Sequence, residues 1–303
     1  MKNKKTLGHI AAFITIMIWG TTFISTKILL EVFTPIEILF IRFLLGYIIL
    51  WIIYPKRLSF QSFQQEKYFI LAGLSGITLY YLFENIALTY TRASNVGVII
   101  SVAPFFTVIF ACLFLQQKRP QFHFFLGFII AMIGISIISF TQSSIQINPL
   151  GDILAIIAAI IWAGYSTITK KISQFNLNTI QTTRRTFFYG LIFMIPVLLT
   201  MDFQVNLSQF NNLTIIANLI FLGVGASALC FVTWNTAVKI LGSVKTSVYI
   251  YIVPVITAIT STLILKESMT WITITGIILT LIGLFLSEQH YKKTEDSIYE
   301  LTE

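Results

Sequence analysis

The chain has 303 residues, of which 56% are apolar and only 11% are charged, and its formal net charge is +8. An average soluble domain carries about 25% charged residues, so this composition argues against a soluble enzyme and indicates a protein embedded in a lipid bilayer. The basic residues form no cluster away from the apolar stretches, which argues against a nucleic acid as a partner.

Ten apolar stretches follow one another along the chain. A bilayer core of about 30 Å needs roughly 20 apolar residues per helix, and stretches of this length lie at 8–29, 34–54, 68–90, 93–115, 121–140, 149–171, 178–200, 213–238, 243–265 and 271–288. The sequence outside them is too short for a soluble catalytic domain. The first stretch follows three lysines as a signal peptide would, but it is too long and is repeated at 149–171, so we predict that it is a mature helix.

The second five stretches repeat the first five. Residues of the same type recur in register, as in the pairs Trp19 and Trp162, Asn85 and Asn235, Pro104 and Pro254. A repeat with an odd number of crossings places its two halves upside down relative to each other. We therefore predict an all-α polytopic membrane protein of ten transmembrane helices. Two inverted five-helix repeats, at 1–145 and 146–290, would surround a central cavity, and 291–303 would form a cytoplasmic tail.

The loop charges predict the orientation, because Lys and Arg near helix ends are in excess on the cytoplasmic side. With the N-terminus inside, the outer ends carry only Lys27, Arg92 and Lys266. The inner segments then carry Lys2, Lys4, Lys5, Lys56, Arg57, Lys67, Lys118, Arg119, Lys170, Lys171, Lys239, Lys245, Lys292 and Lys293. We expect both termini in the cytoplasm and the protein in the cell (inner or plasma) membrane.

Four ionisable residues lie at membrane depth, away from the ends of the apolar stretches: Arg42, Glu84, Arg184 and Arg185. Burying a charged side chain at membrane depth costs free energy, so each such residue is a candidate for a functional role. Arg42 and Arg185 are counterparts in the repeat, and we assign them to gating or to recognition of an anionic group. The alternative for Arg185 is snorkelling, since it lies only about two turns from the inner end.

Glu84 lies about midway along the third stretch, too deep for its short side chain to reach water. Burial alone favours the neutral acid, whereas a nearby arginine or a cationic substrate favours the carboxylate. A proton-coupled carrier can use this switch. A structural pair with Arg42 or with a backbone amide is the alternative.

Polar and aromatic residues at comparable depth complete the predicted substrate site. Small and polar residues at helical spacing share the face of Glu84 and should look toward protein or a wet cavity rather than lipid. The predicted substrate-binding residues are Glu84, Asn85, Tyr80, Trp19, Trp162, Ser101, Trp234, Asn235 and Tyr251. Each aromatic residue taken singly also suits plain packing. The paired Pro104 and Pro254 predict symmetric helix kinks, because proline removes a backbone donor.

No metal or cofactor is expected. The three histidines and two cysteines lack metal-ligand spacing, and the sequence contains no phosphate-cradling loop for ATP. An enzyme is not expected either, since Glu84 has no Asp, Glu or His partner at membrane depth. Glu31, Glu37, Asp152 and Glu267 lie near helix ends.

Several short motifs resemble one known family. They are Ile18–Phe23, Arg42–Phe43 and Ala93–Pro104 in the first half, and Ile161–Ala163, Val253–Val255, Lys266–Glu267 and Gly276–Gly283 in the second. With these the chain resembles, up to about residue 288, the EamA branch of the drug/metabolite transporter superfamily. The resemblance implies a cavity surrounded by stretches 1–4 and 6–9, with stretches 5 and 10 behind them. One departure is Gln117, which stands where the second repeat has Glu267, so the two gates need not work identically.

Members of that family commonly export amino acids, amines or other small metabolites, some in exchange for protons. The resemblance together with Glu84 thus predicts a secondary active transporter that exports small metabolites such as amino acids or amines by alternating access, with protons as the coupling ion. Transport of nucleosides, nucleotide sugars or hydrophobic drugs is the alternative. A membrane scaffold without transport activity is the alternative from a different class.

Overall fold

The computed structural model describes residues 2–91, 93–117, 120–142, 148–201, 203, 210–265 and 270–300. The first half of the chain forms five helical segments, two of which are composite. They are α1 (Lys2–Leu30), α2 (Pro35–Ile53), α3 (Phe63–Ala72) with η1 (Gly73–Leu79) and α4 (Tyr80–Tyr90), α5 (Ala93–Ile100) with α6 (Ala103–Phe114), and α7 (Phe122–Gln142).

The second half repeats this order. Its segments are α8 (Pro149–Ser173), α9 (Thr179–Thr200), α10 (Leu213–Ile220) with η3 (Phe221–Leu229) and α11 (Cys230–Leu241), α12 (Ser243–Ser247) with η4 (Val248–Tyr251) and α13 (Ile252–Leu265), and α14 (Trp271–Glu300). The described part of the chain thus contains ten helical segments and no strand. The predicted tail at 291–303 begins as a continuation of α14, which runs to Glu300.

The helix starts follow local rules. Thr34 and Glu37 form a capping box at the start of α2, where the Thr34 N–H donates to Glu37 Oε2 over 2.8 Å, and Pro35 takes the first-turn position in which a missing N–H costs nothing. Asn148 and Asn178 cap α8 and α9 through their side-chain oxygens. These caps satisfy backbone donors that the helix itself leaves unpaired.

Seven of the described helices are long and apolar enough to cross a membrane, and the apolar parts of α7 and α14 are slightly shorter, at Phe122–Ile138 and Trp271–Ser287. The one remaining segment, α9, begins with a polar run that contains Arg184 and Arg185. The ten-helix polytopic fold is therefore confirmed.

Corresponding helices in the two halves have matching irregularities. A π-helical segment interrupts the third segment at η1 and the eighth at η3. The fourth segment breaks between α5 and α6, directly before Pro104, and the ninth tightens to a 3₁₀ turn at η4, three residues before Pro254. Both prolines thus lie next to a local change in helical geometry, as expected when a backbone donor is missing.

The two halves pack on each other reciprocally. In the first half α1 contacts α11 and α13 of the second, while α8 of the second half contacts α4 and α6 of the first. Likewise α2 packs on η3, and α9 packs on η1. This exchange of equivalent partners is what a pseudo-two-fold relation between the two halves produces, so the predicted two-repeat fold is confirmed.

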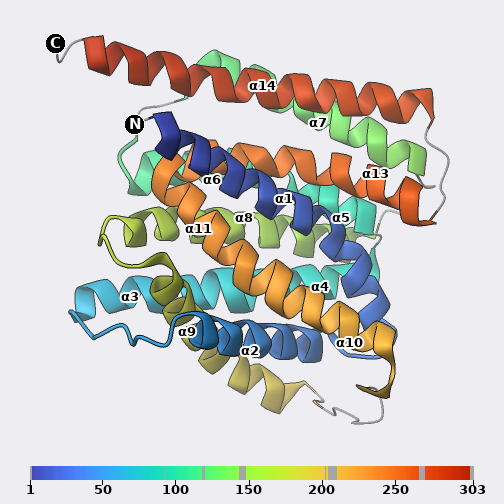
Figure 1. Ribbon diagram of the computed structural model, residues 1–303. Helices are drawn as coiled ribbons and strands as arrows, with labels where there is room; N and C mark the ends of the chain where they lie inside the picture. Colours follow the sequence, from blue (N-terminus) through green and yellow to red (C-terminus); the bar gives the residue numbers. More distant parts are fainter. Residues whose placement is uncertain are drawn as a thin grey trace.

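Helices α7 and α14 pack together at one edge of the bundle, whereas α2 and α9 lie toward the opposite edge (Figure 1). Glycines allow the α7–α14 approach: a Cβ added at Gly127 would lie 2.6 Å from the carbonyl oxygen of Gly283, and one at Gly134 would lie 2.6 Å from that of Gly276. Such close crossings of small residues are typical of membrane helices. The remaining eight segments are thereby left to form the centre.

The main hydrophobic core belongs to both repeats. It contains Ile16, Phe43 and Tyr80 from the first half beside Trp162 and Phe231 from the second. At one end of the bundle Gln181 Nε2 donates to the carbonyl oxygens of Lys56 and Arg57, and Lys239 Nζ donates to that of Leu177. We call this end the basic end; it contains Lys56, Arg57, Arg184, Arg185 and Lys239. The motif Lys266–Glu267 and the loop residues Arg92, Lys118 and Arg119 lie outside the described residues.

Candidate functional site

A small cavity of about 30 Å³ lies between the two repeats, on helices α1, α4, α5, α8, η4 and α13. Its walls are mainly aromatic and apolar, with one charged residue, and consist of Trp19, Thr22, Phe23, Tyr80, Tyr81, Glu84, Ile100, Trp162, Ile250 and Val253. This volume holds about two water molecules. A metabolite therefore needs a wider conformation than this one to enter the cavity.

Glu84 is the charged residue of the cavity wall. Only 6% of its surface is exposed, and its Oε2 atom has no hydrogen-bond partner among the described residues. The carboxyl group is within electrostatic reach of the Tyr80 hydroxyl and the Arg42 guanidinium. A buried acceptor without a partner is costly, which makes this atom a strong candidate for contact with a ligand or a proton.

Arg42 lies one side chain behind the cavity. It is 2% exposed, its Nε donates to Ser227 Oγ over 3.0 Å, and its guanidinium carbon lies 4.4 Å from the centroid of the Tyr81 ring. Its Nη2 atom is buried without a partner. Within the described part of the chain Arg42 and Glu84 form no direct ion pair, and the guanidinium instead lies over the ring of Tyr81 on α4.

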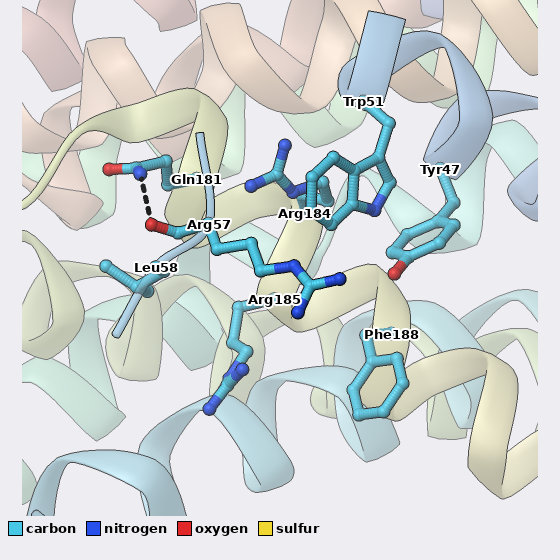
Figure 2. A pocket seen from close by; sticks show the side chains of 8 residues that line it. All are labelled: Tyr47, Trp51, Arg57, Leu58, Gln181, Arg184, Arg185 and Phe188. Carbon is cyan, nitrogen blue, oxygen red and sulfur yellow. Dashed lines mark hydrogen bonds between the residues drawn. The ribbon is translucent and has the colours of Figure 1, made fainter. Parts of the chain in front are cut away.

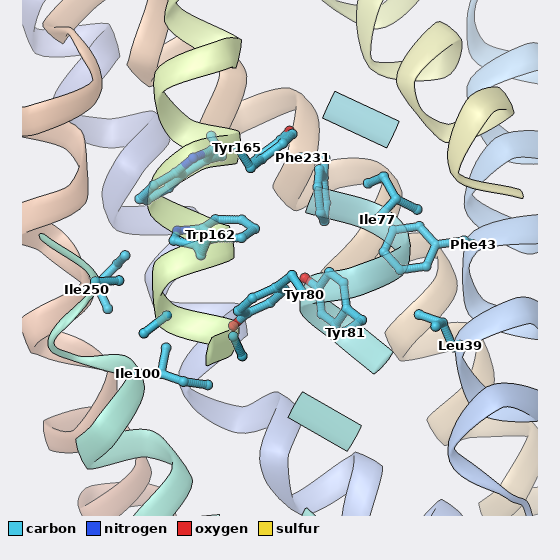
Figure 3. Close-up of a cluster of buried hydrophobic side chains, with 14 of the residues drawn as sticks. Leu39, Phe43, Ile77, Tyr80, Tyr81, Ile100, Trp162, Tyr165, Phe231 and Ile250 are labelled. Carbon is cyan, nitrogen blue, oxygen red and sulfur yellow. The ribbon is translucent and has the colours of Figure 1, made fainter. Parts of the chain in front are cut away.

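Three tryptophans meet beside the cavity. The repeat-related Trp19 and Trp162 pack edge to face with ring centroids 5.1 Å apart, and Trp234 lies 5.1 Å from Trp19 and 5.7 Å from Trp162. Tyr80 packs on Trp162 at 4.7 Å. Figure 3 shows Tyr80, Tyr81 and Trp162 grouped at the centre of the buried cluster. Sequence positions far apart thus form one aromatic wall.

The repeat-related Trp19 and Trp162 differ in hydrogen bonding. Trp19 Nε1 donates to the carbonyl oxygen of Ala226 over 3.0 Å. The Nε1 atoms of Trp162 and Trp234 are buried and have no acceptor among the residues described. Of these two tryptophans, Trp162 lines the cavity and Trp234 does not.

Some of the predicted site residues lie elsewhere. Asn85 donates to the carbonyl oxygen of Pro35 over 3.2 Å, and Ser101 donates to that of Gly97 over 2.7 Å. Tyr251 packs on Phe128, in a separate core cluster. These three bind or pack within the protein and do not line the cavity. Both prolines are also absent from its wall.

Asn235 belongs to a second, narrower cavity of about 20 Å³. Its side chain accepts from the Tyr165 hydroxyl over 3.0 Å and donates to Thr183 Oγ1 over 2.9 Å. The cavity is rich in hydroxyl groups and includes Lys239, whose Nζ donates to the carbonyl oxygen of Leu177 at the basic end. Asn235 therefore lies between the core and the basic end.

Arg185 is not brought to the central cavity. Its Nε lies 2.7 Å from Glu66 Oε1, and that same oxygen accepts from the Tyr189 hydroxyl. Its side chain is 26% exposed. Arg42 and Arg185 are thus equivalent in the repeat but do not share a site.

The list of candidate residues from the sequence missed several wall residues, among them Thr22, Ile100 and Val253. Small and aliphatic residues carry no chemical signal by themselves. Helical spacing could have found Thr22, since it lies three residues after Trp19. Among the described residues no group of three or more His, Cys, Asp or Glu side chains could hold a metal ion.

Known proteins resemble this chain over nearly its whole length. The model of the EamA-like transporter family matches twice, at residues 6–140 and 149–288. An uncharacterized transporter of Archaeoglobus fulgidus is 31% identical over 95% of this chain and 99% of its own length, and one of Clostridium kluyveri is 26% identical over 95% of both chains.

A solved crystal structure covers 92% of this chain and 97% of its own with a TM-score of 0.74 and 16% sequence identity. At that identity the likeness concerns the fold alone. The relatives' names point to transport and say nothing of a substrate.

Proposed function

Because the chain belongs to the EamA-like transporter family and is a multi-pass membrane protein, we propose that it exports small amines or amino acids by alternating access, in exchange for protons. The observation that carries the proposal is the unpaired carboxyl oxygen of Glu84 in a cavity to which both repeats contribute. Inverted repeats of this kind provide two equivalent gates around one midplane site.

The wall chemistry favours a cationic group. A substrate ammonium could bind Glu84 and the faces of Tyr80, Tyr81 and Trp162, since aromatic rings attract cations. The free Trp162 Nε1 could donate to a carboxylate or carbonyl oxygen of the same substrate. An amino acid offers both groups. A nucleotide sugar would instead need cationic side chains in the wall, and none is present there; a purely apolar drug would leave Glu84 unpaired.

Exchange of substrate for protons can arise because a proton and the substrate ammonium ion compete for the same carboxyl group, that of Glu84. A protonated Glu84 offers no charge to an ammonium ion, whereas a deprotonated one does. If the carrier changes conformation only with a proton or a substrate on Glu84, then inward movement of protons drives outward movement of substrate. The small volume of the cavity in this conformation fits the closed step of such a cycle.

The charge of the basic end suggests how the protein is oriented in the membrane. Positively charged loops remain on the cytoplasmic side of a membrane, so we assign the basic end and both chain termini to the cytoplasm of the cell membrane. The two units of the fold would then be the repeats at 1–145 and 146–290, with 291–303 as the cytoplasmic tail.

A binding screen tests the substrate class. The purified protein is heated with amines, amino acids, nucleosides or sugars at pH 6 and pH 8. A ligand at 100 times its dissociation constant stabilises the folded state by about 2.7 kcal/mol. We expect stabilisation by amines or amino acids that is stronger at pH 8. Stabilisation confined to nucleosides or anions would contradict the proposal.

A substitution tests the coupling. Glu84→Gln should fold, since glutamine has the same shape and no charge to bury, but transport in liposomes should lose its dependence on a pH gradient. The matched control is Glu66→Gln, which removes another buried carboxylate outside the cavity and should keep the dependence. Unchanged coupling in Glu84→Gln would remove this residue from the mechanism.

A further inference from the structure

A wider pocket of about 280 Å³ opens at the basic end, where α2 ends and α9 begins. It shares no wall residue with the central cavity, and it is lined by Tyr47, Trp51, Arg57, Leu58, Gln181, Arg184, Arg185 and Phe188. Figure 2 shows the side chain of Arg57 crossing the middle of this pocket toward Tyr47. Three arginines in one pocket of a membrane protein call for an explanation.

Arg184 has three contacts within the protein but no acidic partner among the described residues. Its guanidinium carbon lies 3.6 Å from the centroid of a Trp51 ring, and its two terminal nitrogens donate to the carbonyl oxygens of Tyr54 and Lys56. The residue is 4% exposed. Carbonyl groups are dipoles and do not neutralise a full positive charge, so this guanidinium keeps its attraction for an anion.

The other two arginines differ in their partners. Arg185 is paired with Glu66, whereas the exposed side chain of Arg57 forms no hydrogen bond or ion pair with any residue in the described ranges. Gln181 fixes the backbone of Arg57 by donating to its carbonyl oxygen over 3.1 Å. The pocket therefore has an excess of about two positive charges, one fixed and one free to reach a ligand.

The surroundings of the pocket are apolar. Ile52 and Ile53 at the end of α2 are 69% and 61% exposed, and Phe188 on the pocket wall is 41% exposed. Exposed aliphatic side chains on a membrane helix face lipid tails, and Trp and Tyr gather where tails meet headgroups. A ligand in this pocket thus meets cations at one end and hydrocarbon beside them.

We propose that this pocket binds the phosphate of an anionic phospholipid headgroup. Arginine forks match phosphate oxygens in pairs, and basic pockets between membrane helices on the cytoplasmic side suit anionic lipids. The acyl chains would lie along the exposed aliphatic face of α2 and α9. A soluble phosphate ion would use the same guanidinium groups but would gain nothing from this apolar face.

The test compares two single substitutions in one loop. Arg57→Gln removes the free guanidinium from the pocket. Lys56→Gln removes an equal charge from the neighbouring position, and the side chain of Lys56 does not line the pocket. Both residues are exposed, so both variants should fold. Native mass spectrometry and thermal unfolding then measure binding of phosphatidylglycerol and phosphatidylcholine to the detergent-solubilised protein.

We expect phosphatidylglycerol to bind and stabilise the protein in preference to phosphatidylcholine. Arg57→Gln should weaken that binding about fivefold, the effect of one basic residue near an anionic surface, and Lys56→Gln should change it less than twofold. Equal losses in the two variants would overturn the proposal, because they would indicate general surface attraction. Stabilisation by inorganic phosphate without any by phosphatidylglycerol would overturn it as well.

Discussion

Arg42 and Arg185 occupy equivalent positions in the two repeats and have opposite surroundings. Arg42 is 2% exposed, bonds to Ser227 and stacks on Tyr81 behind the central cavity. Arg185 is 26% exposed and pairs with Glu66 toward the basic end. The repeat thus keeps the same side chain at the same helical position while the two environments diverge.

The same contrast holds around the cavity. Where the first repeat has Tyr80 and Glu84, the second has Cys230 and Trp234, so only one half supplies a carboxylate to the cavity wall. The backbone, in contrast, matches closely, with π-helical segments at η1 and η3 and reciprocal packing partners. Duplication therefore explains the architecture, and the differences between the halves explain the chemistry of the site.

The largest expected effect separates the two arginines. Arg42→Ala should lower the free energy of unfolding by about 3 kcal/mol and abolish transport, because it leaves a void, an unpaired Ser227 hydroxyl and no positive charge near Glu84. Arg185→Ala should cost about 1 kcal/mol, since its ion pair is partly solvated. Denaturant unfolding in detergent measures both. Equal losses, or an Arg42→Ala protein with normal transport, would mean that the two environments are not distinct.

Next in size is a test of the backbone symmetry. A Cβ added at Gly73 would lie 2.7 Å from the backbone nitrogen of Gly190 on α9, and one added at Gly223 would lie 2.7 Å from Leu45 Cβ on α2. Both alanine variants should therefore destabilise the protein by a similar amount, about 1–3 kcal/mol. Gly164→Ala is the control, since its nearest neighbour is 3.6 Å away. A large effect in one repeat alone would contradict the symmetry of the helix crossings.

The smallest effect on stability concerns the paired tryptophans. Trp19→Phe removes a hydrogen bond to the Ala226 carbonyl oxygen and should cost about 1 kcal/mol. Trp162→Phe loses a similar ring volume but only a buried N–H that has no acceptor among the described residues, so its melting temperature should fall less than that of Trp19→Phe. A Trp162 that contacts substrate predicts in addition a raised KM for this variant. An equal fall in melting temperature with an unchanged KM would indicate a structural role.

The fold could be predicted closely from the sequence because bilayer thickness sets the length of each apolar helix, and the repeat indicates how many helices there are and in what order they come. The wall of the central cavity could be predicted only in part. Glu84 and the aromatic residues of α1, α4 and α8 were found since charge or aromaticity at membrane depth is a chemical signal. Asn85 and Tyr251 gave the same kind of signal, yet the former holds the Pro35 carbonyl and the latter packs on Phe128.

The sequence by itself determined that the protein lies in a bilayer, that it has ten apolar helices in two repeats, and that a carboxylate lies at membrane depth. These follow from composition and spacing along one chain. Only the tertiary structure decided that Glu84 keeps an unpaired oxygen in the cavity, that Trp19 and Trp162 touch, and that Arg185 turns to Glu66 rather than to the centre. Each of these depends on how helices from both repeats rotate and cross, and that rotation minimises the packing energy of the whole bundle rather than of any single segment.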